Sequence, residues 1–152
     1  MRKGLWIMGV MAMGAVLFLA TISQHLVVDV SGIEEAKTLQ SILRGSFPQL
    51  LAPEPPLRVL RVPPSEAVKG FRWRVEATLR PGVDPKSSPV AGRLLDRMVA
   101  RCLSTTVLQR PPAGVILVLH GADGAETRLD FDGQGRAVPP PAPPPAPPGG
   151  PR

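Results

Sequence analysis

The chain has 152 residues, of which 43% are hydrophobic and 20 are proline, and its formal net charge is +6. One cysteine, Cys102, excludes an intrachain disulfide, and together with only two histidines it excludes a zinc site built from Cys and His. Without Arg2, Lys3 and Arg152, which lie in the terminal segments, 15 basic residues stand against 12 acidic ones, and a net charge of +3 is too small to indicate nucleic-acid binding.

The N-terminal segment, residues 1–28, has the pattern of a membrane anchor. An apolar run of 18 residues covers positions 5–22. As a helix it spans about 27 Å, and continuation to residue 28 covers the roughly 30 Å of a bilayer core. The run exceeds the ~7–15 apolar residues of a signal peptide, and the cleavage site at residues 21–23 is poor. We predict a single-pass, uncleaved signal-anchor helix. A cleaved signal peptide and a buried soluble helix are the alternatives.

The charges on either side of this segment predict its orientation. Arg2 and Lys3 precede it, whereas Asp29, Glu34 and Glu35 follow it. By the positive-inside rule, the N-terminus is cytoplasmic and the remainder lies outside the cytoplasm. Arginine outnumbers lysine and the chain has no Asn or Tyr, a bias typical of GC-rich bacterial genomes. The expected location is the bacterial cytoplasmic (inner) membrane with a periplasmic domain, or a secreted protein if the signal is cleaved.

Residues 29–138 must supply the folded core. The first part predicts a helix over 31–45, with Ser31 as its N-cap, Glu34 completing a capping box and Gly45 as its C-cap. Its apolar stripe is expected to contain Ile33, Ala36, Leu39 or Gln40, and Leu43. A short strand follows at 57–62, between two Pro-Pro pairs that favour a sheet edge. The segment 71–79 alternates apolar and polar residues, the strongest strand pattern in the chain.

The second part repeats this order of elements. A helix is expected after Ser88 as N-cap and Pro89 at its first position. Its stripe is expected to contain Val90, Leu94, Met98 and Cys102, widened by Ala91, Leu95 and Val99. A continuous apolar strand, 114–120, and an alternating strand, 126–132, complete the order αββαββ. We predict an α+β two-layer sandwich, ferredoxin-like or related, with four strands and both helices on one face. Cys102 is expected to be a buried thiol.

The C-terminal segment, residues 139–152, is a proline-rich tail. Nine of its 14 residues are proline, which predicts a disordered polyproline II spacer without a core. The PxxP spacing would also suit an aromatic groove on a partner.

The stretch LDFDGQGR, residues 129–136, resembles the start of a calcium-binding loop. Such a loop needs a bidentate acid at its twelfth position, which here is Pro141. Leu129 and Phe131 alternate as in a strand, and residues 132–135 supply turn chemistry. We therefore predict a hairpin and no metal site.

Catalytic patterns are weak. VILVLHGADG, residues 115–124, resembles the segment that leads to the oxyanion hole of α/β-hydrolases, but the chain has no G-x-S-x-G nucleophile motif and no histidine after His120. No phosphate-binding glycine loop is present. Asp130 and Asp132 share a polar strand face, where solvation explains them. The sequence predicts no catalytic residue, no metal ligand and no cofactor, and we interpret the protein as a non-enzyme.

Five arginines are the candidate site residues. Arg93, Arg97 and Arg101 recur every four residues along the second helix, and Arg72 and Arg74 line the polar side of a strand. Cross-strand ion pairing of Arg72 and Arg74 with residues of 126–132 is one interpretation. The other is contact with anionic lipid, an acidic partner or another anionic ligand.

An anchor followed by an αββαββ domain resembles in architecture the assembly-platform proteins of type II secretion and type IV pilus systems, which implies a role in assembly. We predict a membrane-anchored, extracytoplasmic, non-catalytic binding or assembly module. Its partner would be a protein or a second copy of the chain, bound through the strand edge at 57–62. The alternative is a secreted protein whose basic domain binds an anionic ligand or surface, and nucleic acid is the least expected partner.

Overall fold

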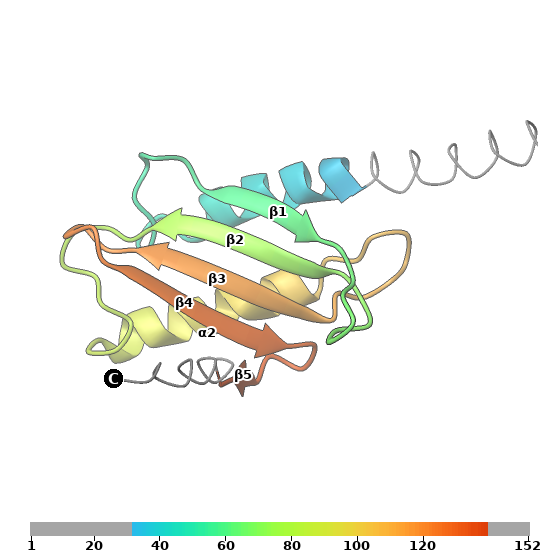
Figure 1. Ribbon diagram of the computed structural model, residues 1–152. Coiled ribbons are helices and arrows are strands. Elements are labelled where there is room, and N and C mark those ends of the chain that lie inside the picture. The colour runs from blue at the N-terminus through green and yellow to red at the C-terminus, as the bar shows by residue number, and fades with distance from the viewer. Residues whose placement is uncertain (1–31, 140–152) are drawn as a thin grey trace, which may run out of the picture.

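The computed structural model describes residues 32–139, which form an α+β domain of two helices and a five-stranded mixed sheet (Figure 1). A first helix over residues 32–46 is followed by β1 (Arg58–Val62), β2 (Arg72–Thr78), α2 (Pro89–Leu103), β3 (Gly114–His120), β4 (Glu126–Asp132) and β5 (Ala137–Val138). The predicted anchor, Ser31 and the tail beyond Pro139 lie outside the described residues. Within residues 32–139, no helix is both long and apolar enough to cross a bilayer.

The order of strands in the sheet is the order of the strands in the chain. β2 and β3 pair in parallel, with α2 as the crossover between them, and the other neighbours pair in antiparallel fashion. The ferredoxin-like arrangement, a split βαβ, would separate the two parallel strands, so this part of the expectation is not met. The fifth strand was not predicted, because only two residues after the turn pair with β4.

Both helices lie on one face of the sheet and enclose the core (Figure 1). β2 alternates as predicted: Trp73, Val75 and Ala77 are buried against the helices, while the residues between them are half-buried on the other face. Every residue of β3 before His120 is buried. A strand that is apolar on both sides belongs in the middle of a sheet, and the chain places β3 there.

The first helix differs from its prediction at its C-terminal end and in one residue of its apolar stripe. It continues through residue 46, so Gly45 is a helical residue and not the C-cap. Leu39 and Leu43 are fully buried as predicted, but Ile33 is 55% exposed. The stripe therefore begins one turn later than the spacing indicated.

α2 begins as predicted and buries most of the predicted stripe. The Ser88 side chain caps it by accepting a hydrogen bond from the backbone N–H of Ala91 at 3.3 Å, and Pro89 is its first residue. Val90 is 58% exposed, against prediction, and Leu94 is only partly buried. The buried residues are Ala91, Leu95, Met98, Val99 and Cys102. All five belong to the predicted stripe as widened, so the prediction failed only on the side of the stripe that carries Val90 and Leu94.

Candidate functional sites

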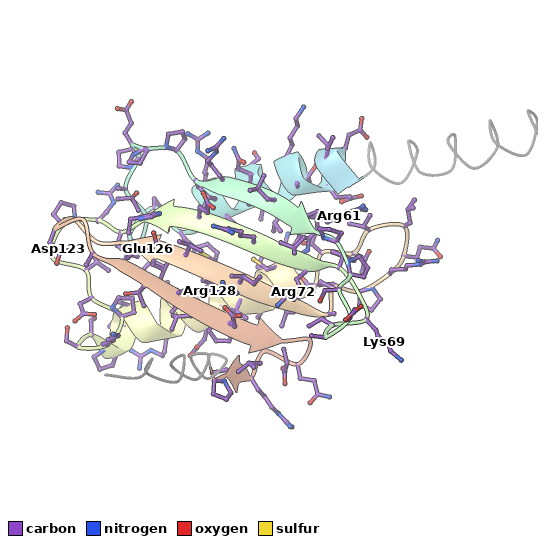
Figure 2. All side chains as sticks on the ribbon, in the orientation of Figure 1. Arg61, Lys69, Arg72, Asp123, Glu126 and Arg128 are labelled. Atoms are coloured by element: carbon purple, nitrogen blue, oxygen red, sulfur yellow. The ribbon has the colours of Figure 1, made fainter. Side chains whose placement is uncertain are left out.

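The sheet face turned away from the helices, which we call the open face, carries most of the charged side chains of the strands. Residues that are directly paired across neighbouring strands project to the same face. The register therefore gathers one charged set there: Arg58, Arg72, Arg74, Glu76, His120, Glu126, Arg128, Asp130 and Asp132. Figure 2 shows Arg72, Glu126 and Arg128 on this face.

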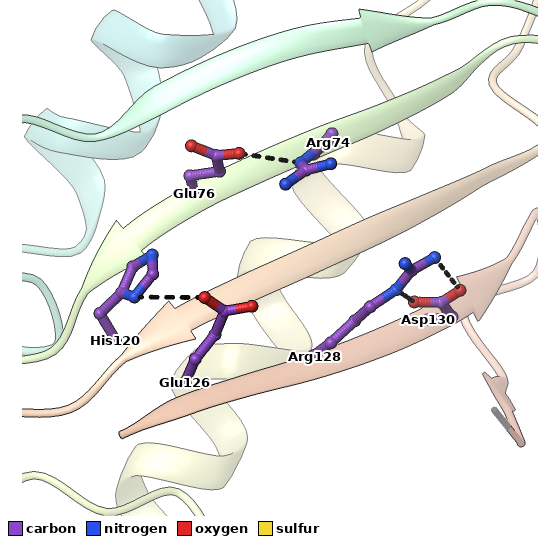
Figure 3. Close-up of polar contacts among 6 residues, drawn as sticks. All are labelled: Arg74, Glu76, His120, Glu126, Arg128 and Asp130. Carbon is purple, nitrogen blue, oxygen red and sulfur yellow. Dashed lines mark hydrogen bonds and ion pairs between the residues drawn. The ribbon is translucent and has the colours of Figure 1, made fainter. Parts of the chain in front are cut away.

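The charged groups pair along their own strands or with a direct neighbour (Figure 3). Arg74 Nε lies 2.9 Å from Glu76 Oε1 on β2, and Arg128 makes two hydrogen bonds to Asp130 on β4, at 2.8 and 3.0 Å. The hydrogen bonds from Arg128 also raise the pKa of that guanidinium. Pairing of Arg72 and Arg74 with β4 was one expectation. It is not observed, because β3 lies between β2 and β4.

Two guanidinium groups on this face lack a full set of acceptors. Nε of Arg72 and Nε of Arg74 are buried and have no hydrogen-bond partner among the described residues. The contact of Arg74 with Glu76 is therefore an ion pair in which the N–H is not aimed at the carboxylate, although the atoms are only 2.9 Å apart. Buried donors without acceptors are uncommon. The Arg74 side chain as a whole is 43% exposed, so the outer part of its guanidinium can still donate hydrogen bonds to a carboxylate above the sheet.

The middle of the open face is apolar. Ile116 and Val118 of β3 are only 5% and 3% exposed, although no helix covers this side. Their neighbours in register are Arg74 and Asp130 for Ile116, and Glu76 and Arg128 for Val118. At the two edges, Leu60 of β1 and Val138 of β5 are 47% and 44% exposed.

The five predicted arginines do not form one surface. Arg93, Arg97 and Arg101 are all exposed on α2, in the helix layer, whereas Arg72 and Arg74 are half-buried on the open face. No salt bridge joins Arg93, Arg97 or Arg101 to another residue within 32–139. The i, i+4 spacing on the helix does produce a basic ridge, but the sheet separates it from the strand arginines.

The LDFDGQGR segment is the predicted hairpin turn between β4 and β5. The Asp132 carboxylate accepts hydrogen bonds from the backbone N–H groups of Gln134 and Arg136, each at 2.9 Å, and Gly135 has a positive φ of 77°. These bonds, first that of Arg136, hold the pKa of Asp132 below its ordinary value. Among the described residues, no group of three or more His, Cys, Asp or Glu side chains could hold a metal ion.

A hollow of about 510 Å³ lies where β2 and β3 end, between residues 79–86 and 119–129. The carboxyl ends of parallel strands are common ligand sites. Here the polar groups stabilise turns instead. Arg80 Nε donates to the carbonyl of Leu51, and the carboxylates of Asp84 and Asp123 accept backbone N–H groups of the next turn. The described polar groups around the hollow therefore do not converge on a substrate.

A second groove, of about 600 Å³, lies between the first helix and β1. Its lining combines apolar and basic residues: Gly32, Ile33, Ala36, Lys37, Gln40, Val59, Leu60, Arg61 and Pro63. The Gln40 side chain accepts a hydrogen bond from the N–H of Val59 at 3.3 Å, so the helix covers part of the β1 edge. β1 is the edge strand that the prolines predicted. The sequence pattern assigned Ile33 to the core, and nothing in it indicated a groove.

His120, the histidine of the hydrolase-like segment, is the last residue of β3. Its Nδ1 lies 3.9 Å from Oε2 of Glu126, and its side chain is 40% exposed.

A family-model scan, a search of curated proteins and a search of solved structures each found no match to this chain.

Proposed function

We propose that the protein is a membrane-anchored, extracytoplasmic, non-catalytic binding module that assembles with another membrane protein. The observation that carries the proposal is the groove between the first helix and β1. It begins at Gly32, only a few residues after the predicted anchor, and Ile33 offers an apolar contact beside Lys37. A groove at this end of the domain would face the bilayer at close range, within reach of another protein held in the membrane.

The geometry of the groove also suggests what would bind. β1 leaves part of its outer edge unpaired within the described sheet, and an extended segment can add to such an edge through main-chain hydrogen bonds. Gln40 restricts this addition because it already occupies the N–H of Val59. An extended peptide or an amphipathic helix that lies across Ile33 and Leu60 is the kind of partner that this groove would admit.

Two measurements on the full chain test the proposal. The mass of the protein in carbonate-washed membranes should be that of the intact chain, because an uncleaved anchor resists extraction. A photo-reactive residue in place of Ile33 should then cross-link to a defined protein, and one in place of Val90 should not. Val90 is the matched control, since it is equally exposed but lies on α2.

A chain that begins near residue 24 and is released by carbonate would contradict the anchor. That result would favour the second candidate, a secreted domain that binds an anionic surface. The exposed ridge of Arg93, Arg97 and Arg101 is the observation behind this candidate. Its binding would weaken as salt is raised, because exposed charges are screened.

A further inference from the structure

We propose that the open face is a self-association surface, on which a second copy of this chain packs face to face about a twofold axis along β3. This surface differs from the groove between the first helix and β1, with which it shares Leu60 at the β1 edge. The argument rests on the order of charges across the sheet, which is antisymmetric about its middle strand.

The two central rows of the sheet show this antisymmetry. In one row, Arg74 on β2 and Asp130 on β4 flank Ile116. In the next row, Glu76 and Arg128 flank a valine of β3 in the same way, with the signs reversed. A twofold axis along β3 exchanges the β2 side with the β4 side. It therefore sets Arg74 over Asp130 of the second copy, and Glu76 over Arg128 of the second copy.

The ion pairs that already exist fit this arrangement. Arg74–Glu76 on one copy would lie above Asp130–Arg128 on the other, so that each charge has an opposite charge both beside it and across from it (Figure 3). Such networks are stronger than isolated surface pairs. The guanidinium of Arg74, whose side chain is 43% exposed, would gain a second carboxylate.

The outer parts of the face follow the same rule. Arg72 and Asp132 flank Gly114 in register, so the axis would set Arg72 over Asp132 of the second copy. The stem of Arg72 crosses Gly114, where a Cβ would lie 3.6 Å from its Cδ. At the edges, Leu60 is brought over Val138 of the second copy, which covers two of the exposed apolar side chains. Three of the four rows that span β2 to β4 are thus self-complementary in charge, and the fourth sets Glu126 over the uncharged Thr78 of the second copy.

The size of the face sets the expected strength. Strands about 4.8 Å apart and about 3.3 Å per residue give roughly 450 Å² for each copy, or roughly 900 Å² for two, close to the ~1,000 Å² minimum of a specific interface. Aligned sheets cross at about 30°, which the long arginine side chains can follow. Association is therefore expected to be weak in dilute solution and favoured when copies share a membrane, because tethering raises the effective concentration.

Charge reversal on the full chain tests the axis. Two differently tagged copies are co-expressed, and their co-purification is measured. Arg74→Glu on both copies should reduce co-purification about tenfold or more, and so should Asp130→Arg on both, because close interfacial charge pairs couple strongly. A mixture of one Arg74→Glu copy and one Asp130→Arg copy should associate like the original chain. In that mixture, the new carboxylate at position 74 meets the new guanidinium at position 130, and the other pair is unchanged.

The controls separate loss of contact from loss of fold. Arg93→Glu makes the same charge change on α2 and should leave co-purification unchanged. The double variant Arg74→Glu/Asp130→Arg in one chain should associate with itself, which also shows that these changes permit folding. A short bismaleimide should link copies that carry His120→Cys, since position 120 lies on β3 near the axis. The unsubstituted chain is the blank, because Cys102 is buried.

Three results would overturn the proposal: no association of the original chain, equal association of all the variants, or loss in the single variants without recovery in the mixture. The last two would place any self-association on another surface. The comparison among the variants does not test the groove or the anchor, because every variant carries both unchanged. Carbonate extraction and cross-linking at Ile33 report on those separately.

Discussion

Trp73 is the largest side chain that is fully buried in the domain. Its ring meets Phe71 edge to face at 5.3 Å, and its Nε1 donates a hydrogen bond to the carbonyl of Thr105 at 3.1 Å. The ring thus joins the central sheet to the loop that follows α2. A single side chain holds two parts of the chain 32 residues apart.

Two substitutions of Trp73 should therefore destabilise the domain to different extents. Trp73→Ala is expected to lower the free energy of unfolding by about 3–5 kcal/mol, through lost contacts and a cavity. Trp73→Phe keeps much of the ring but leaves the Thr105 carbonyl without its donor, at a cost of about 1–3 kcal/mol. The urea midpoint measures both effects. Val90→Ala on the exposed side of α2 is the control and should stay within about 0.5 kcal/mol. A urea midpoint of Trp73→Phe equal to that of the original chain would contradict a role for the hydrogen bond.

Cys102 is the single thiol, and burial raises its pKa from 9.0 to about 12. Below pH 9 the thiol is protonated whether the chain is folded or unfolded, so its effect on stability is constant there. Between pH 9 and about 12 the unfolded chain loses the proton and the folded chain keeps it. Stability should therefore fall as pH rises through this window.

At pH 8, a maleimide should label the thiol of Cys102 slowly in the native protein and rapidly in urea. Rapid native labelling would show that the site opens.

At the scale of the elements, one side chain of the first helix occupies a backbone donor on the outer edge of β1. Gln40 engages the N–H of Val59 across the groove, where an unpaired strand would otherwise present a donor. Helices that cover sheet edges protect proteins against unintended strand addition.

Gln40→Ala should release that donor. The amide of Val59 is expected to exchange with solvent several-fold faster, and the variant should aggregate more readily on heating. Hydrogen exchange followed by NMR or mass spectrometry measures the first effect, and light scattering measures the second. Lys37→Ala is the matched control, since Lys37 lies one turn away from Gln40 in the lining of the same groove. Unchanged exchange at Val59 would mean that its amide is protected by other groups.

The helices and strands themselves were largely predictable from the sequence. Which face of a helix packs on the sheet, and which strands lie side by side, were not. The cap at Ser88, the alternation of β2 and the hairpin turn at Asp132 depend on residues close in sequence. Ile33 and Val90 were assigned to the core wrongly because helical spacing fits two adjacent stripes, and only the packed sheet decides between them. Strand order depends on contacts between distant residues, which one sequence pattern does not encode.

For the candidate sites of the whole molecule, single charged residues were likewise predictable from the sequence, whereas their arrangement in space was not. The sequence singled out five arginines, but it grouped side chains that lie in different layers. It also allowed Arg74 to meet β4 directly, which the position of β3 prevents. The antisymmetric charge rows exist only once the register of four strands is known. No segment of the chain carries that pattern by itself.

The sequential strand order has a consequence for how the domain is made. A nascent chain emerges N-terminus first, and each strand of this sheet pairs with the one that emerged before it. The sheet can therefore grow by adding one strand at a time to the same edge. α2 forms after β2 has been added and before β3 is added. In a split βαβ arrangement, the two parallel strands have to leave room between them for another strand, which can be synthesised later. This domain never has to wait for its later residues in order to finish its earlier pairings, an advantage for any chain delivered one end first.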